Sequence, residues 1–114
     1  DASVRIAENA RRHGVELQVV TGTAPGALSG LPDPDAVFVG GGGAQVLAAC
    51  AARTPSRLVA AYASLERGTE ARGILAGAGY RVGGALLQSS RMADLAGATR
   101  LAATNPVLLL WGSR

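Results

Sequence analysis

DAVFVGGGG, residues 35–43, decides the fold: an apolar run that ends in four consecutive glycines. Val37, Phe38 and Val39 favour a β-strand, and their unbroken apolar run is typical of a strand covered on both faces of a parallel sheet. Residues 44–53 then predict a helix. Glycines at the carboxyl end of such a strand permit a sharp turn or the close approach of a ligand. Because ligands of open α/β sheets bind at that end, we expect a ligand site here, with a simple tight turn as the alternative.

The composition indicates one small domain and excludes several protein classes. Of 114 residues, 48% are hydrophobic and 17% are charged, which excludes a disordered chain. No apolar run approaches the roughly 20 residues of a membrane span, and no signal peptide is evident, so we expect a cytoplasmic protein. Cys50 is the single cysteine and is expected to pack as a small hydrophobic residue, with no disulfide and no metal site.

The charge pattern narrows the choice of ligand. The net charge of +3 comes from arginine alone, because the sequence contains no lysine. A Walker phosphate-binding loop requires a lysine after its glycines, so this class is excluded. The arginines are dispersed and aromatic residues are few, so we expect no nucleic-acid partner. A dehydrogenase half is disfavoured too, because Gln45 occupies the third glycine position of a GxGxxG motif that would begin at Gly40.

The rest of the chain alternates helix and strand patterns. Helices are expected at 1–13, 25–31, 44–53 and 65–78, and strands at 15–21, 36–39, 57–63, 80–89 and 105–111. Residues 90–104 leave no room for a crossover helix packed on the sheet, so the last strand is expected to be antiparallel. The sequence therefore predicts an α/β layer fold with a mostly parallel sheet and an antiparallel last strand.

Three segments resemble the decarboxylating precorrin-6Y methyltransferase family of cobalamin biosynthesis. They are ENARRHGVELQVVTGTAPGAL (8–28), PDAVFVGGG (34–42) and RLVAAYASLE (57–66), and residues 89–114 are similar to the closing hairpin of that family. The most specific pieces are GxAPxAL and DAVFVGGG. The resemblance implies a Rossmann-like methyltransferase sheet whose last strand inserts beside its predecessor. It also implies S-adenosylmethionine as cofactor and a precorrin tetrapyrrole as the substrate that is methylated and decarboxylated.

The start of the chain departs from the family pattern. The family's domain begins with a strand carrying a glycine-rich loop for the cofactor and a second strand ending in a ribose-binding acid, and neither precedes Asp1 here. We therefore expect residues 1–114 to form one partial methyltransferase domain that lacks the amino-terminal strands and is inactive alone. Missing strands would expose apolar edges, which predicts a rearranged sheet or an intertwined dimer, and hence a homo-oligomer.

The resemblance assigns two groups of cofactor contacts. The first group would lie against the adenine and comprises Gly22, Thr23 and Ala24. The second would pass beneath the sulfonium and comprises Gly40, Gly41 and Gly42. Methyl transfer depends mainly on alignment of the reacting atoms, so few acid or base residues are expected.

Three charged residues are candidates for contact with the substrate. Arg91 and Arg100 lie in the last hairpin connection, which is expected to hang over the carboxyl ends of the strands, and arginine binds carboxylates bidentately. Solvated surface is the alternative for both. Glu66 follows a strand end and is the candidate catalytic residue, to orient substrate or accept a proton; the alternative is a first-turn acid favoured by the helix dipole.

A second class of function stays open at this stage. The same layer fold also suits a non-catalytic nucleotide-binding or interaction module, because a fold does not by itself determine a function. Binding of S-adenosylmethionine distinguishes the two hypotheses.

Overall fold

The computed structural model describes residues 2–114, which form two compact units divided after Leu31. The first unit contains helix α1 (Ala2–Arg12) and one short 3-10 turn, η1 (Gly26–Leu28). Basic residues in the last turn of α1 suit the negative end of the helix dipole, and Gly14 follows with a φ of +66°. The expected first helix is confirmed over these residues; Asp1 lies outside the described part.

The segment between α1 and η1 contradicts one prediction. Residues 15–21 form no strand, and Val15 and Leu17 are 51% and 60% exposed. Strand propensity mostly measures how well a side chain packs on a pleated surface, and an isolated strand leaves its backbone groups unpaired. The predicted strand at 15–21 is therefore wrong, because no strand pairs with it among the described residues.

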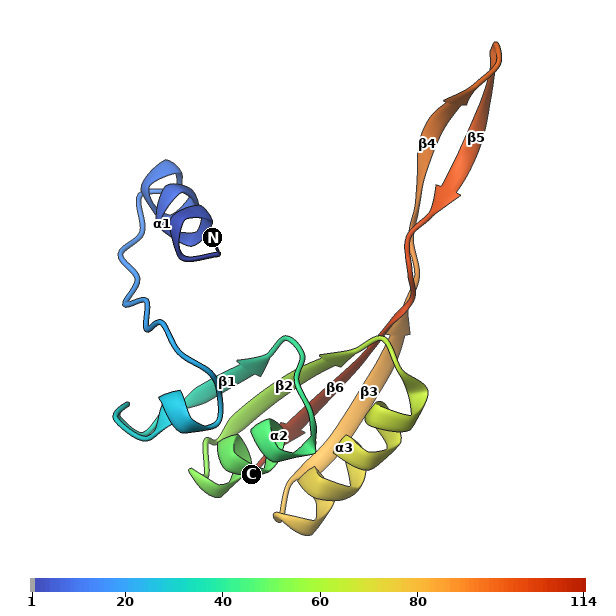
Figure 1. The fold of residues 1–114 in the computed structure, drawn as a ribbon. Helices are drawn as coiled ribbons and strands as arrows, with labels where there is room; N and C mark the ends of the chain where they lie inside the picture. The colour runs from blue at the N-terminus through green and yellow to red at the C-terminus, as the bar shows by residue number, and fades with distance from the viewer. Residues whose placement is uncertain (1) are drawn as a thin grey trace. The chain divides into compact units, whose positions relative to one another are not determined.

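The second unit is an α/β layer (Figure 1). Its elements are β1 (Ala36–Val39), α2 (Ala44–Ala52), β2 (Arg57–Tyr62), α3 (Leu65–Gly77), β3 (Arg81–Leu87), β4 (Ser90–Leu95), β5 (Ala98–Ala103) and β6 (Val107–Ser113). The main sheet has the order β1-β2-β6-β3, with β1 parallel to β2 and β6 antiparallel to both of its neighbours. The antiparallel last strand inserted beside β3 is thus confirmed. The rearranged sheet is not observed, because β1 pairs only with β2.

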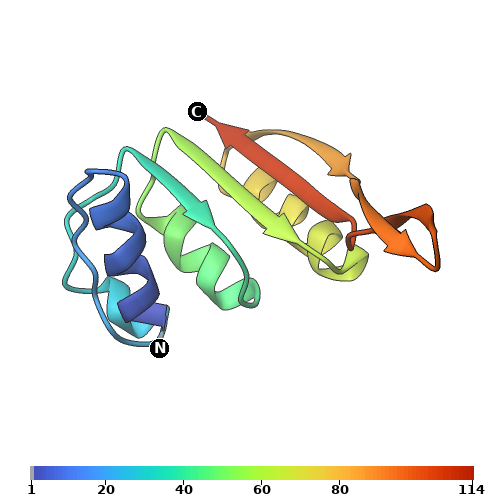
Figure 2. The same ribbon diagram turned by 90° about the horizontal axis from the view of Figure 1, so that it is seen from above.

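Helices α2 and α3 cover one face of the sheet (Figures 1 and 2). Alternate residues of β2, Leu58 and Ala60, point to that face and are fully buried, together with Leu47 of α2 and Leu75 of α3. Cys50 is buried in the same core, as expected. Phe38 points to the other face and is 66% exposed. Within the second unit, the helices cover only one face of the sheet, and coverage of this strand on both faces stays a prediction.

Strands β4 and β5 form a separate two-stranded sheet in the connection from β3 to β6. Ala96 and Gly97 join them with φ angles of 43° and 83°, the positive values that two-residue hairpin turns require. The hairpin projects from the edge of the main sheet (Figure 1), so the exclusion of a crossover helix here is confirmed. Within residues 2–114, no helix has the length and apolar character needed to cross a membrane.

Candidate functional site

A cavity of about 450 Å³ lies at the carboxyl ends of β1 and β2. These strands are parallel, so the loops that follow them meet at one edge of the sheet. One wall is formed by residues 40–43 and the other by residues 61–64, and Arg67 of α3 is the one charged residue that lines it. The cavity therefore lies where the glycine run predicted a ligand site.

The glycine loop needs its glycines for two physical reasons. Gly41 and Gly42 have φ angles of 147° and 89°, which residues with a side chain rarely adopt. A Cβ atom on Gly42 would lie 3.1 Å from Cγ2 of Val46, and one on Gly43 would lie 3.2 Å from Nη1 of Arg67. The loop thus lines the cavity with backbone and packs closely against Val46 of α2 and the end of the Arg67 side chain.

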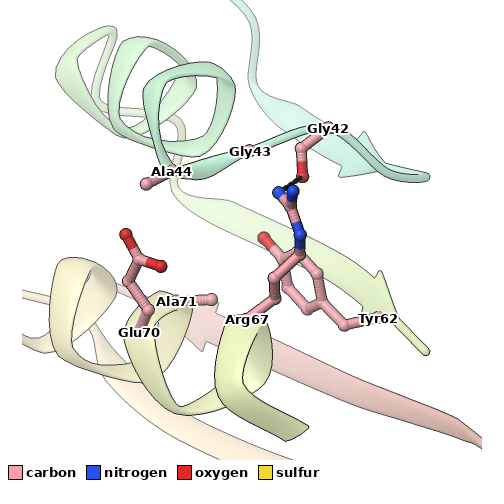
Figure 3. Close-up of a pocket in the computed structure, with 7 residues that line it drawn as sticks. All are labelled: Gly42, Gly43, Ala44, Tyr62, Arg67, Glu70 and Ala71. Atoms are coloured by element: carbon pink, nitrogen blue, oxygen red, sulfur yellow. Dashed lines mark hydrogen bonds between the residues drawn. The ribbon is translucent and has the colours of Figure 1, made fainter. Parts of the chain in front are cut away.

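Arg67 joins the glycine loop to α3 (Figure 3). Its Nη1 donates a hydrogen bond of 3.1 Å to the carbonyl oxygen of Gly42. Its backbone N–H donates to Oγ of Ser64, the N-cap residue of α3, at 3.3 Å. The guanidinium is therefore held beside the cavity by its bond to Gly42, while the backbone of Arg67 is fixed by the cap of the helix.

A smaller pocket is also lined by Arg67 (Figure 3). It shares Gly42, Gly43, Tyr62 and Arg67 with the cavity and adds Glu70 and an alanine from each helix, Ala44 and Ala71. Burial raises the pKa of the Tyr62 phenol, an effect that nearby Arg67 partly opposes. Tyr62 therefore stays protonated at neutral pH.

An apolar pocket of about 230 Å³ adjoins the same site. Tyr62 and Ala63 line both it and the large cavity. Its other lining residues are apolar: Leu65, Leu86, Pro106 and Leu108. The edge of the sheet thus offers a space lined by backbone and one cation beside a space lined by apolar side chains.

Glu66 lies in the first turn of α3 and lines none of these three spaces. Its carboxylate accepts a hydrogen bond of 3.0 Å from Oγ of Ser64. Its own backbone N–H and that hydroxyl lower its pKa. This is the geometry of a helix-start acid, and a catalytic role for Glu66 stays a prediction.

Gly22, Thr23 and Ala24 lie in the first unit, just before η1. A Cβ on Gly22 would lie 2.9 Å from Cβ of Ala27, and the carbonyl of Thr23 accepts a 2.9 Å hydrogen bond from the Ala27 N–H. Local packing against the turn thus accounts for the glycine. Contact of these three residues with a cofactor stays a prediction.

Arg91 and Arg100 lie on the hairpin and are exposed. Arg100 pairs with Ala93, two residues beyond Arg91, so both arginines are diagonal neighbours on one face. Neither lines the cavities described above. Their contact with a substrate stays a prediction.

Sequence reasoning missed Arg67 and Tyr62. Tyr62 reads as one more apolar strand residue, and only the fold shows that its ring separates two spaces. Arg67 carries a signal that was available: a cation in the first turn of a helix opposes the helix dipole. Such a residue has to be stabilised by something other than its own helix.

Comparisons with known proteins agree on one family. A family model described as "Precorrin methyltransferase domain" matches residues 1–113. The decarboxylating precorrin-6Y C(5,15)-methyltransferase of a Sinorhizobium species is 41% identical over an alignment of 93 residues that covers 77% of this chain and 22% of that protein.

Solved structures give the same result. A precorrin-6Y C5,15-methyltransferase from Geobacter metallireducens superposes with a TM-score of 0.81 at 28% identity, covering 96% of this chain and 61% of that one. The C-terminal domain of the Rhodobacter capsulatus precorrin-6Y C5,15-methyltransferase gives a TM-score of 0.73 at 34% identity, with coverages of 96% and 61%. The chain thus spans under two thirds of the length of each of these relatives.

Proposed function

The chain belongs to the precorrin methyltransferase domain family, and on that basis we propose that it supplies part of the site of an S-adenosylmethionine-dependent methyltransferase. The substrate is a precorrin tetrapyrrole, which is methylated on carbon and decarboxylated in cobalamin biosynthesis. The 41% identical Sinorhizobium relative, a decarboxylating precorrin-6Y C(5,15)-methyltransferase, supports this assignment.

The observation that carries the proposal is the glycine wall of the 450 Å³ cavity. Gly41 and Gly42 have positive φ angles that disfavour a side chain, so the backbone itself forms this wall. Such a surface fits the flat and extended parts of the cofactor, which supplies an electrophilic methyl group on sulfur when bound. The role of Gly40, Gly41 and Gly42 is to place bare backbone beneath that methyl group, so that alignment with the substrate carbon is unobstructed.

The remaining assignments complete the same proposal. Gly22, Thr23 and Ala24 are proposed to contact the adenine of the cofactor. Arg91 and Arg100 share an exposed hairpin face, which suits two carboxylates of one substrate. Glu66 is ionised at neutral pH and is the proposed group that orients the substrate or accepts a proton.

We infer that the protein is a cytoplasmic homo-oligomer. Met92 and Leu101 pair across the hairpin face opposite to the two arginines, and they are 79% and 70% exposed. Large apolar side chains on a marginally stable two-stranded sheet favour association. Sedimentation of the chain and of a Met92→Asp variant tests this: a lower mass for the variant supports association through this face, and an unchanged mass excludes it.

Calorimetry with S-adenosylmethionine tests the function. The titration compares residues 1–114 with a chain extended at its amino terminus to the length of the solved relatives' domains. The extended chain is expected to bind and residues 1–114 to bind weakly or not at all. An extended chain that ignores the cofactor excludes the methyltransferase proposal, whereas binding without methyl transfer to a precorrin supports a non-catalytic nucleotide-binding module.

A further inference from the structure

We propose that Arg67 binds a carboxylate of the substrate within the 450 Å³ cavity, an inference that rests on the proposed function. The group recognised is the acidic side chain of a polycarboxylated tetrapyrrole. Arg67 would thereby determine which edge of the macrocycle faces the glycine loop.

The first argument is the hydrogen-bonding state of the guanidinium. Arginine has five N–H donors, and the one side-chain contact of Arg67 is the bond from Nη1 to the Gly42 carbonyl. Among residues 2–114, no carboxylate lies within ion-pair distance of it. Since that single bond is made to a neutral carbonyl, no carboxylate of the described residues forms an ion pair with this guanidinium.

The second argument is the position of Arg67 in its helix. It lies in the first turn of α3, where a cation opposes the helix dipole. The start of this helix is already capped by the Ser64 hydroxyl, which accepts the Arg67 backbone N–H, so the guanidinium is not needed there. An anionic ligand in the cavity would compensate for this unfavourable placement.

The third argument is that the cavity containing Arg67 adjoins an apolar pocket. A pyrrole ring that carries a carboxylate has an apolar edge a short distance from its charge. The apolar pocket adjoins the cavity through Tyr62 and Ala63, and Leu86 and Leu108 are among its other lining residues. Glu70 lines only the smaller pocket, so no acidic side chain of the described residues lines the cavity to repel the ligand.

Arg67 also differs from the two hairpin arginines in how it can position a bound substrate. All three side chains are exposed, but Arg91 and Arg100 lie on a projecting hairpin and line none of the cavities described above, whereas Arg67 lines the large one. Arg67 is fixed to the loop that is proposed to underlie the cofactor. A carboxylate bound there would be positioned relative to the methyl group, which a contact on the hairpin does not achieve.

Fluorescence titration with uroporphyrin, a polycarboxylated tetrapyrrole, tests the inference on the extended chain. Arg67→Gln is expected to weaken uroporphyrin binding by about tenfold or more, which is the loss of one charge-assisted contact. Arg67→Lys keeps the positive charge but loses the planar guanidinium. Its affinity for uroporphyrin is expected to lie between those of the parent and of Arg67→Gln. Arg72→Gln, an exposed arginine of the same helix outside the cavities, is the matched control and is expected to bind like the parent.

S-adenosylmethionine affinity, measured by calorimetry on the same variants, separates the possible outcomes. Unchanged cofactor affinity with weakened uroporphyrin binding in Arg67→Gln supports the inference. Equal loss of both ligands means that Arg67 only positions the loop, and it overturns the carboxylate assignment, as does uroporphyrin binding equal to the parent's. A parent chain that binds the cofactor but no uroporphyrin also overturns the inference, whereas a parent that binds neither rejects the proposed function itself.

Discussion

Two β-prone segments of this chain have opposite structures. Residues 36–39 (AVFV) form strand β1, and residues 15–21 (VELQVVT) form no strand, although both are rich in valine. The four residues of β1 pair with β2, and Val39 is buried against the helix layer. Residues 15–21 lie in the other unit and find no strand among the described residues. Strand formation here depends on a neighbour more than on the residues themselves.

Truncating one leucine in each region tests this contrast, and Leu58→Ala is expected to have the largest effect on stability. Leu58 of β2 is fully buried, whereas Leu17 is 60% exposed. Leu58→Ala leaves a cavity under both helices and is expected to lower the free energy of unfolding by about 2–5 kcal/mol. Leu17→Ala is expected to change it by less than about 0.5 kcal/mol. Urea denaturation followed by circular dichroism measures both, and similar losses for the two variants would contradict the contrast.

The next largest difference in stability is expected when a glycine in each region is replaced by alanine. Gly42 has a φ of 89°, and a Cβ on it would lie 3.1 Å from Val46. Gly42→Ala is expected to cost about 1–3 kcal/mol of stability through backbone strain. Gly30 of the first unit has no atom within 4 Å of its added Cβ, so Gly30→Ala serves as the control and is expected to change stability by less than about 0.5 kcal/mol. A Gly42→Ala variant as stable as the parent refutes the requirement for glycine in the loop.

A buried hydrogen bond in the second region can be compared with an exposed one in the first. The Tyr80 hydroxyl donates a buried 2.6 Å bond to the Pro55 carbonyl, whereas Ser3 and Thr21 share an exposed contact of 3.4 Å. Tyr80→Phe is expected to lose about 1–2 kcal/mol, because the carbonyl is left buried and unpaired. Ser3→Ala is expected to have little effect. Equal melting temperatures of the two variants would show that the buried hydrogen bond contributes no more to stability than the exposed one.

The smallest expected effect concerns the start of α3. Ser64 caps this helix through its hydroxyl, and Ser64→Ala is expected to cost about 1 kcal/mol. The N-cap of α2 is Gly43, which makes no side-chain cap, so Gly43→Ala removes no such bond. Thermal unfolding of Ser64→Ala measures the loss, and a variant as stable as the parent rules out the cap.

The same hydroxyl lowers the pKa of Glu66. A carboxyl group whose pKa is lowered on folding stabilises the fold above its unfolded pKa, and this contribution is lost as the pH falls through the folded value. Ser64→Ala is therefore expected to raise the pKa of Glu66 toward its ordinary value. NMR titration of the Glu66 carboxyl carbon measures the change, and an unmoved titration curve argues against the bond.

Local sequence patterns predicted most helices and strands of the second region. They failed where the formation of a strand depends on pairing with a segment distant in the sequence. The unit from β1 to α3 was predicted to within about two residues at each end, because apolar runs, glycines and the Ser64 cap act locally. Residues 15–21 carry the same local preference and lack a partner, which no local pattern reveals. Strands β4 and β5 were predicted only as a connection, since their pairing depends on the turn at Ala96 and Gly97.

The residues of the candidate site also fall into those that the local sequence predicts and those that only the fold brings together. Gly40, Gly41 and Gly42 were predictable, because a run of glycines directly after a strand is longer than a tight turn alone requires. Arg67 reaches the site from the next helix but one along the chain, through a contact with Gly42 that spans 25 residues. Only the parallel pairing of β1 and β2 places that helix start beside the glycine loop.

Backbone hydrogen exchange of the extended chain, with and without S-adenosylmethionine, tests the central claim most directly. If residues 40–43 form part of the cofactor site, the amides of Gly41, Gly42 and Gly43 will exchange more slowly with cofactor, and those of β4 and β5 will not change. Cofactor binding by calorimetry with unchanged exchange at all three glycines would contradict the claim.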